Sequence, residues 1–539
     1  MHIFNKFKLL FFNYLAVIIA ALVLVLFHSN FEGEIALNCI ENALFAVILI
    51  SISHLMRNNK FRHIYGQLAF IGFSLTMIFE TLYYLLFKVF ISPSTLYLFF
   101  DTNTNESIEF IQSYIGGFEI FSTLALLAVS LFCFKRLKNQ YASFGVFSVK
   151  LSLKIVLLIG ITLGYLKWST HIIYNLPYLS IKSFIEYSRV SKQLDVYTLD
   201  EHGLFEDASS SLGQQNEGVY VLILGESTAR SHMGLYGYER QTTPRLNSIS
   251  NSLWTFNDVI SPNTHTIESV TKMLTRGNYE NLDLTSKGSI IQLANAAGFK
   301  TIWLSNQRPV GVHESLVTKI ARSAAEVRFM TTMHGRHNRI LDQDLLPELD
   351  AILDTPSNQP KFIIVHLSGT HMLYENRYPE DEQVFLDTPN IAYKSYDNYR
   401  TVNHYDNAVL YTDFIINNII QKIKGLETKS TVLYLSDHGE ELFQDADFSG
   451  HNEDVATKSM YDIPFFLWQS DIYKKDKSLT FHANRKYMAD DFFHTMAHVL
   501  QISSTMVDTT RSIFSKSFKI RPRLVLTGQD YDTLFDQKP

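Results

Sequence analysis

The pattern of hydrophobic and polar residues divides the 539-residue chain into two parts of different character. Five long apolar runs lie at about 9–29, 37–56, 65–91, 117–134 and 151–168. Each is close to the ~20 residues that cross a bilayer core, so residues 1–168 are predicted to form five transmembrane helices. The first run is too long for the apolar region of a signal peptide, and no small-residue cleavage site follows it. We therefore expect it to remain as an anchor.

The connections between these runs alternate in charge. Basic residues lie before the first run, between the second and third, and between the fourth and fifth: Lys6, Lys8, Arg57, Lys60, Arg62, Lys135, Arg136, Lys138 and Lys150. The other connections carry acidic residues: Glu32, Glu34, Asp101, Glu106 and Glu109. By the positive-inside rule, everything after Trp168 lies outside the cytoplasm. This bias also argues against five buried helices of a soluble protein. Glu80, inside the third run, is a functional candidate, or it pairs within a polar cavity.

Residues 169–217 are predicted to connect the two parts. The stretch YLSIKSFIEYSRVSKQL has apolar residues at helical spacing with Lys and Arg between them. This pattern fits a helix on the membrane surface or an ordinary packed connector, and the two remain open. DASSSLGQQNEG then has the composition of a polar linker.

Residues 218–539 alternate short β-branched runs with helical patterns. The apolar runs VYVLIL, KTIWLS, FIIVHL, TVLYLS and PFFLW begin at residues 219, 300, 362, 431 and 464. NAVLYTDFIINNIIQKI and ADDFFHTMAHVL have helical period. Strands that are apolar on both faces, with helices between them, predict an α/β domain with a mostly parallel sheet. Ligands bind beyond the carboxyl ends of the strands in such sheets.

Residues of metal-binding type follow several of these strands. They are Glu226, His371, Asp437, His438 and, slightly later, His451. Carboxylate and imidazole ligands in a site without cysteine suit zinc, with manganese as an alternative. Singly, such residues are more often hydrogen-bonded structural groups or helix caps. Their combination at one edge of one sheet predicts a metal site.

Composition excludes other classes of protein. Residues 1–170 carry 12 Lys and Arg against 8 Asp and Glu, and the remainder carries 35 against 45, which together give the net charge of −6. Neither part has the concentrated basic surface that nucleic-acid binding requires. The two cysteines, Cys39 and Cys133, both lie in apolar runs. The outer domain therefore has no disulfide framework, thiolate metal site or cysteine nucleophile.

Several motifs resemble, in order, those of bacterial phosphoethanolamine transferases. They are GESTARSHMGLYGYERQTTPRL, SPNTHTIESVTKMLT, WLSNQ, HLSGTHMLYENRYP, YDNAVLYTD and SDHGEEL with a later GH. The resemblance covers the five-helix anchor as well, and hence essentially the whole chain. It implies an alkaline phosphatase/sulfatase-like α/β/α domain in the periplasm, anchored in the bacterial inner membrane. It also implies transfer of phosphoethanolamine from phosphatidylethanolamine to lipopolysaccharide, at a core sugar or lipid A, or to a related envelope acceptor.

The resemblance implies roles for individual residues. Glu226, Asp437, His438 and the Thr266 hydroxyl would hold a zinc ion, Thr266 being the nucleophile, while one zinc or two stays open. His371 and His451 would contact the substrate phosphate or a second zinc. The helical pattern from Ile267 to Leu274 places Thr266 at a helix N-terminus, where free N–H groups favour a phosphoryl anion; a plain helix cap is the alternative. Asn306, His366 and Tyr374, beside the motifs, line the substrate site or serve packing. Many members brace this domain with disulfides, and the absence of cysteine here favours the core-sugar-modifying branch.

Three other functions compete with this interpretation. A sulfatase or phosphodiesterase-like hydrolase shares the fold and the SDHG segment, but a sulfatase needs a modified cysteine or serine where this chain has NTHTIES. A phosphoglycerol transferase also uses a threonine and the same metal, although YGYERQTTP favours phosphoethanolamine. A non-catalytic envelope scaffold disagrees with the retention of Thr266 and all the metal-type residues.

Overall fold

The computed structural model describes residues 2–27, 33–102, 104–141, 149–213, 217–307, 316–330, 341–526 and 528–535. Glu32 and part of the predicted linker, residues 214–216, lie outside these ranges. Contacts divide the chain into two units. The first unit is Met1–Phe100 with Phe110–Tyr187, and the second is Asp101–Glu109 with Ser188–Pro539.

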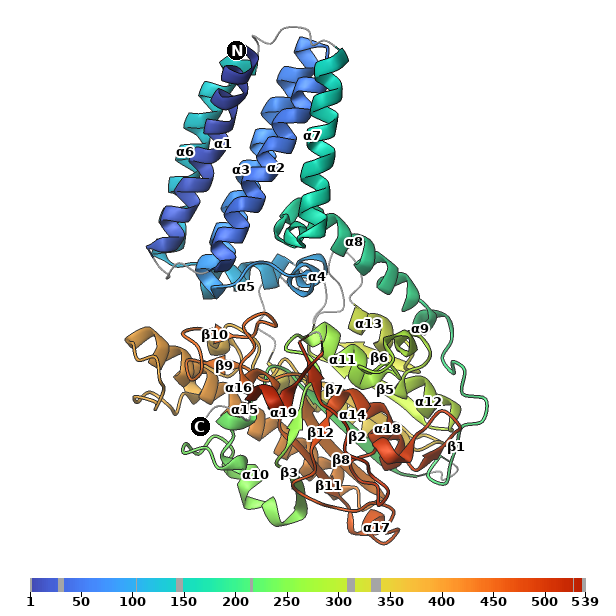
Figure 1. The fold of residues 1–539 in the computed structure, drawn as a ribbon. Helices are drawn as coiled ribbons and strands as arrows, with labels where there is room; N and C mark the ends of the chain where they lie inside the picture. The colour runs from blue at the N-terminus through green and yellow to red at the C-terminus, as the bar shows by residue number, and fades with distance from the viewer. Residues whose placement is uncertain are drawn as a thin grey trace. The chain divides into compact units, whose positions relative to one another are not determined.

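The first unit is a bundle of long helices (Figure 1). They are α1 (His2–Leu26), α2 (Gly33–Leu55), α3 (Asn59–Phe87), α6 (Gly117–Tyr141) and α7 (Val149–Trp168), with the shorter α4 (Pro93–Asp101) and α5 (Thr104–Tyr114) between α3 and α6. All five long helices contain stretches long and apolar enough to cross a membrane, which confirms the predicted five. Tyr14, Phe70 and Phe73 pack in the interior of the bundle, whereas Phe12, Leu124 and Leu157 are exposed. The exposed apolar side chains suit a lipid environment.

A helix follows the bundle where the sequence predicts one. After the short turn η1 (His171–Tyr174), α8 (Leu176–Gln193) and α9 (Val196–Leu199) continue the chain. Ile181, Phe184 and Ile185 of α8 are exposed. Its position on a membrane surface stays a prediction.

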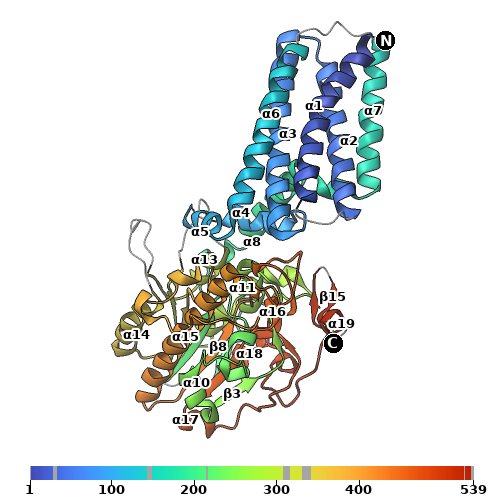
Figure 2. The same cartoon turned by 90° about the vertical axis from the view of Figure 1, so that its left-hand side faces the viewer.

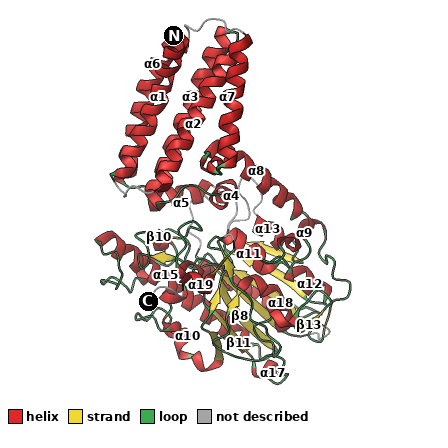
Figure 3. Ribbon diagram, in the orientation of Figure 1, coloured by secondary structure: helices red, strands yellow, loops and turns green. Residues whose placement is uncertain are grey.

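The second unit is built on a seven-stranded sheet with helices on its faces (Figures 2 and 3). In spatial order the strands are β3 (Leu253–Phe256), β11 (Phe465–Gln469), β8 (Ser430–Ser436), β2 (Val219–Gly225), β7 (Lys361–His366), β5 (Lys300–Ser305) and β6 (Glu326–Phe329). From β8 to β6 all neighbours are parallel, and only β11 runs against its two neighbours. The predicted α/β domain with a mostly parallel sheet is confirmed.

Helices cover the sheet because its central strands are apolar on both faces. Every residue of β2, β7 and β8 is buried. Val219, Val221 and Ile223 of β2 share one core with α10 (Pro244–Ser248), α14 (Leu345–Asp354) and α15 (Tyr396–Gly425). Alternate residues of a strand point to opposite faces of the sheet. Tyr220 accordingly points to the other face, where its ring packs against the rings of Phe299 and Tyr473. The remaining helices are α11 (Thr266–Leu274), α12 (Ile290–Ala296), α13 (Leu316–Ala321), α16 (Lys458–Tyr461), α17 (Asp471–Lys474), α18 (Phe492–Val499) and α19 (Tyr531–Phe535).

Short strand pairs complete this unit. They are β1 (Ser209–Ser210) with β13 (Ile502–Ser503), β4 (Val259–Ile260) with β12 (Tyr487–Met488), β9 (Glu441–Leu442) with β10 (Ser449–Gly450), and β14 (Leu524–Val525) with β15 (Gln529–Asp530). The β9–β10 pair matters most for function, because residues of the candidate site flank it.

Candidate metal centre and nucleophile

Three neighbouring parallel strands deliver candidate residues to one edge of the sheet. Glu226 follows the last residue of β2, and Asp437 and His438 follow the last residue of β8. Gly225 of β2 is in register with Ser436 of β8, so the residues after them emerge side by side. β7 flanks β2 on the other side, and His371 lies five residues after its end.

Glu226, Asp437 and His438 form a compact buried group. Their ligand atoms lie within 4.8 Å of one another. His438 Nε2 is 3.4 Å from Oε1 of Glu226 and 3.5 Å from Oδ2 of Asp437. None of the three side chains is more than 1% exposed. Two carboxylates and one imidazole in this arrangement are a ligand set that suits zinc.

The hydrogen bonds of this group leave one atom of His438 and one atom of Asp437 available to a cation. His438 Nδ1 lies 2.8 Å from the carbonyl oxygen of Gly439, so it carries a hydrogen, and Nε2 is the nitrogen that could bind a metal. Oδ1 of Asp437 accepts from the backbone N–H groups of Ser227 and His438. The other oxygen of Asp437, Oδ2, is buried and accepts no hydrogen bond from the described residues. A metal ion would satisfy Oδ2 of Asp437 and replace a hydrogen on Nε2 of His438.

Electrostatics point the same way. Burial and the neighbouring Glu226 carboxylate raise the pKa of Asp437 to about 7. Burial lowers the pKa of His438, but the Asp437 and Glu226 carboxylates outweigh this effect and raise the pKa to about 10. Both shifts report an excess of buried negative charge, which a divalent cation would offset.

The Thr266 hydroxyl lies against this group. It is 3.2 Å and 3.3 Å from the two carboxylate oxygens of Glu226 and 3.3 Å from His438 Nε2. Thr266 is the first residue of α11, and the preceding His265 occupies the N-cap without a capping side-chain bond. The Thr266 side chain therefore turns toward Glu226 and His438 rather than capping the helix. The geometry fits a fourth ligand that is also a nucleophile.

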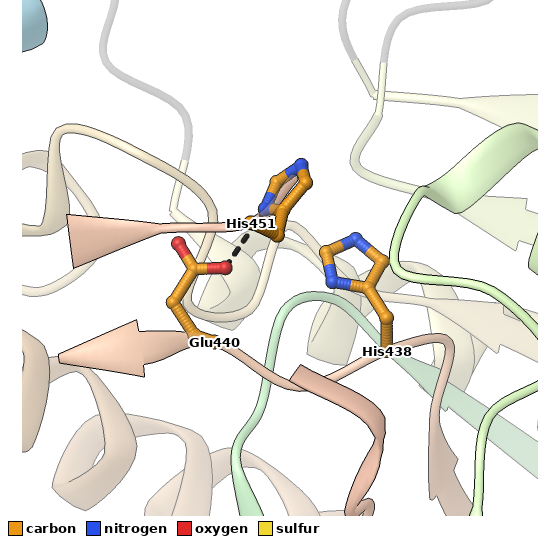
Figure 4. A group of neighbouring side chains, drawn as sticks. All are labelled: His438, Glu440 and His451. Carbon is orange, nitrogen blue, oxygen red and sulfur yellow. Dashed lines mark hydrogen bonds and ion pairs between the residues drawn. The ribbon is translucent and has the colours of Figure 1, made fainter. Parts of the chain in front are cut away.

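A second group adjoins the first (Figure 4). His438, Glu440 and His451 have ligand atoms within 4.8 Å of one another. Glu440 precedes β9 and His451 follows β10, and the antiparallel pairing of these strands places the two residues opposite each other. His451 Nδ1 lies 2.8 Å from Glu440 Oε2, while the His451 and His438 rings are 4.2 Å apart between centroids. This arrangement could contact a phosphate or hold a second ion.

His371 belongs to neither of these groups of ligand-type residues. Its Nδ1 is 3.4 Å from Arg377 Nη2 and 3.9 Å from Oε2 of Glu109, which belongs to the same structural unit. Arg377 also donates from Nε to the His371 carbonyl oxygen and pairs with Glu109 at 2.6 Å. Arg377 beside His371 is the type of group that contacts a phosphate, and burial lowers the pKa of His371, which favours its neutral form.

Two residues at the site were missed by the sequence reasoning. Glu440 lies within the SDHGEEL motif, and its position two residues after His438 was the available signal. Gln307 donates from Nε2 to Glu226 Oε2 at 2.8 Å, although WLSNQ drew attention to Asn306. Asn306 instead donates to Asp342. His366 packs against Trp303, and Tyr374 donates to Glu440 Oε1 at 2.6 Å.

Comparison with known proteins places this geometry in a class and then in a family. The Sulfatase family model matches residues 219–502, which include the sheet and both groups of ligand-type residues. The second unit is therefore a sulfatase-family domain of the alkaline phosphatase type.

Relatives match the membrane part as well. The chain is 30% identical over 488 residues to phosphoethanolamine transferase EptC of Escherichia coli, covering 84% of this chain and 83% of that protein. It is 29% identical to phosphoethanolamine transferase CptA of Salmonella typhimurium with the same coverage. The zinc complex of the C-terminal periplasmic domain of E. coli EptC covers 61% of this chain and 93% of that domain, with a TM-score of 0.57 and 32% identity.

The fold of the whole chain also has a counterpart. The integral membrane lipooligosaccharide phosphoethanolamine transferase A of Neisseria meningitidis covers 94% of this chain and 98% of its own, with a TM-score of 0.69 and 20% identity. The chain belongs to the family of membrane phosphoethanolamine transferases. It is a transferase enzyme and a multi-pass membrane protein with a soluble C-terminal domain.

Proposed function

We propose that the enzyme moves phosphoethanolamine from phosphatidylethanolamine to lipopolysaccharide, at a core sugar or lipid A, through a phosphoethanolamine ester on Thr266. The observation that carries this proposal is the Thr266 hydroxyl, held 3.2 Å from Glu226 and 3.3 Å from His438 at the start of α11. The EptC and CptA relatives, named as phosphoethanolamine transferases, support the transferred group.

Glu226, Asp437, His438 and Thr266 are the proposed zinc ligands. The fit rests on the orphaned Asp437 Oδ2, the position of His438 Nε2 beside both carboxylates and the absence of cysteine from this unit. These residues would hold a zinc ion, which would lower the pKa of the Thr266 hydroxyl and offset the negative charge of the phosphodiester. The zinc complex of the EptC domain supports the choice of metal. One bound ion accounts for the first group, and the number of ions at the second stays open.

The proposed reaction consists of two displacements at one phosphorus atom. Thr266 Oγ1 forms a bond to the donor phosphorus as the bond to the diacylglycerol oxygen breaks, and the diacylglycerol stays in the bilayer. An acceptor hydroxyl then forms the new bond as the Thr266 ester breaks. His371 and His451 contact the phosphoryl oxygens, and the free N–H groups at the start of α11 face the same anion. Splitting the transfer in two lets one site serve donor and acceptor in turn.

The same proposal sets the location and excludes a sulfatase. The bundle lies in the bacterial inner membrane with residues 218–539 in the periplasm, on the side of the membrane where the outer leaflet carries the lipid donor. Cys39 lies in α2 and Cys133 in α6, so neither can provide a cysteine-derived sulfatase nucleophile in the catalytic unit.

The decisive experiment traps the intermediate. Purified enzyme incubated with phosphatidylethanolamine and no acceptor should carry phosphoethanolamine on the peptide that contains residues 261–272, and addition of lipopolysaccharide should discharge it. Mass spectrometry locates the group, and Thr266→Ala is the control. Transfer to lipopolysaccharide without any labelled peptide would refute the covalent route. The absence of both would refute the function.

A further inference from the structure

A cluster of polar side chains lies inside the membrane bundle, where each polar group is costly unless it is satisfied. Its members come from α2, from α3 and from the turn that precedes α8. They are Asn38, Glu41, Asn42, Glu80 and Asn175, and none is more than 6% exposed. We call these five residues the membrane polar cluster. They lie outside the proposed catalytic site and take no part in it.

Hydrogen bonds draw both glutamates to the start of α8. Oε2 of Glu80 accepts from the Nδ2 groups of Asn38 and Asn42, each at 3.1 Å. Oε1 of Glu41 accepts from Asn175 Nδ2 at 2.8 Å. The backbone N–H of Leu176, the first residue of α8, faces the Glu80 carboxylate. The free N–H groups at a helix N-terminus favour negative charge, which supports an anionic cluster.

Three acceptor atoms of the cluster remain unused. Glu41 Oε2, Glu80 Oε1 and Asn42 Oδ1 are buried and have no hydrogen-bond partner among the described residues. The ion pairs found in the described parts of the chain include none with Glu41 or Glu80. An unsatisfied buried acceptor costs about 1–3 kcal/mol, so three together indicate a missing partner. A partner that donates hydrogen bonds and carries a positive charge would satisfy these atoms and offset the two carboxylates.

The cluster lies at the end of the bundle from which the chain leaves toward the catalytic unit. α2 begins at this end, α3 ends at it, and Asn175 follows the end of α7 at Trp168. Trp168 is 83% exposed, and aromatic residues of this kind mark the membrane–water interface. The cluster therefore lies toward the end of the bundle where lipid headgroups are expected.

We propose that the membrane polar cluster binds the ammonium group of an ethanolamine lipid. A primary ammonium carries one positive charge and three N–H donors, which match the three free acceptors. A quaternary ammonium has no N–H group to donate. The choice of lipid rests on the proposed function, in which phosphatidylethanolamine is the donor, and the cluster would hold it at the membrane surface before reaction.

The test measures lipid binding to the full-length Thr266→Ala protein, so that no transfer takes place. The protein is equilibrated with equimolar phosphatidylethanolamine and phosphatidylcholine of identical acyl chains, and native mass spectrometry counts the lipids retained. We expect phosphatidylethanolamine to be retained at least about tenfold better, which corresponds to ~1.4 kcal/mol. Lipids with one and two N-methyl groups should be retained progressively less. Equal retention of all four lipids by this protein would overturn the proposal without any cluster variant.

Variants then assign the preference to the cluster. Glu41→Gln and Glu80→Gln should each reduce the preference for phosphatidylethanolamine. Glu34→Gln, which removes the same charge from the exposed first turn of α2, should retain it. A preference that persists in the double variant Glu41→Gln/Glu80→Gln places the binding elsewhere and overturns the assignment. Millimolar ethanolamine should not displace the lipid. If ethanolamine did displace the lipid, the cluster would be a site for the free amine instead.

These results are separable from the catalytic proposal. Retention of phosphatidylethanolamine by an enzyme that transfers nothing would leave the cluster assignment standing and remove the proposed reaction. Absence of the lipid preference together with normal covalent labelling of Thr266 in the wild-type enzyme would refute the cluster assignment and leave the proposed reaction standing.

Discussion

Thr266 Oγ1 lies 3.2 Å from Glu226 Oε1, although the two residues are 40 positions apart in the chain. Thr264, two residues before the nucleophile, points elsewhere. Its backbone N–H and its hydroxyl both donate to Glu453 Oε2, at 2.9 Å and 3.1 Å. The lead-in to α11 thus holds one threonine at the proposed metal group and the other on a buried carboxylate.

This arrangement predicts different losses for the two threonines. Thr266→Ala removes the attacking atom and should reduce donor cleavage by at least about a thousandfold. Thr264→Ala leaves the attacking atom in place but loosens its loop, and should cost ten- to about a hundredfold through misplacement. Single-turnover labelling with phosphatidylethanolamine measures both. A phosphoethanolamine group found on Thr264, or a Thr266→Ala enzyme that still turns over, would show that the assignment is wrong.

Metal content should separate the two groups of ligand-type residues. Ala in place of Glu226, Asp437 or His438 removes a side chain of the compact group and should abolish both zinc binding and transfer. His371→Ala and His451→Ala should retain the first zinc ion while lowering turnover. Elemental analysis of the five purified variants decides this point. Equal zinc loss in all five would contradict the separation.

The sequence predicts features that depend on neighbouring residues better than features that depend on contacts between residues far apart in the chain. β5 occupies the predicted residues 300–305, because a run apolar on both faces needs no knowledge of its neighbours. β3 and β6 were not predicted, since they are short edge strands with half-buried residues. Glu453, two residues after His451, was given no role, because its partner Thr264 is 189 residues away. Asn306 lies within WLSNQ, yet it holds Asp342, a carboxylate in no motif.

Topology follows from the five helices together with the charge of their connections. A reporter that is active only outside the cytoplasm should be active when fused after about residue 215 and silent when fused near Lys138. The reverse pattern would show that the predicted orientation, with the basic clusters on the cytoplasmic side, is wrong.

Acid should destabilise the catalytic unit through His494. Its Nδ1 accepts the backbone N–H of Asp508 at 3.2 Å, and burial, followed by the charge of Arg511, lowers its pKa to about 3. Between the unfolded value of 6.5 and the folded value, the folded state binds fewer protons, so stability falls as pH decreases. The expected loss from this residue is about 2 kcal/mol between pH 7 and pH 5.

The matched variant for this prediction is His494→Asn, whose Oδ1 can replace the Nδ1 acceptor but does not titrate. Thermal unfolding of both proteins at pH 7 and pH 5 should show a smaller shift in the midpoint for the variant. The proposed metal ligands are the same in both proteins, so zinc loss at low pH cancels in the comparison. An identical shift would contradict the role of His494.

Asp342 should act on catalysis without touching the metal. Its carboxylate is buried and accepts from Asn306 Nδ2 at 2.8 Å and from the backbone N–H groups of Ser368 and Gly369, both at 2.9 Å. Gly369 has a φ of +52°, and a Cβ there would lie 2.8 Å from the Glu226 carbonyl oxygen. Asp342 therefore fixes the turn that packs against Glu226 and leads to His371.

Asp342→Asn replaces one carboxylate oxygen by an amide nitrogen, which cannot accept a hydrogen bond. One of the buried N–H groups that now donate to Asp342 then loses its acceptor, at a cost of about 1–3 kcal/mol. The turn should shift, and kcat/KM should fall ten- to about a hundredfold. Zinc content should stay unchanged, because Asp342 is not a ligand. Asp350→Asn is the matched control, since it removes only a half-exposed ion pair with Lys422, worth about 0–1 kcal/mol. A normal kcat/KM, or zinc loss equal to that of Glu226→Ala, would show that Asp342 does not position the turn.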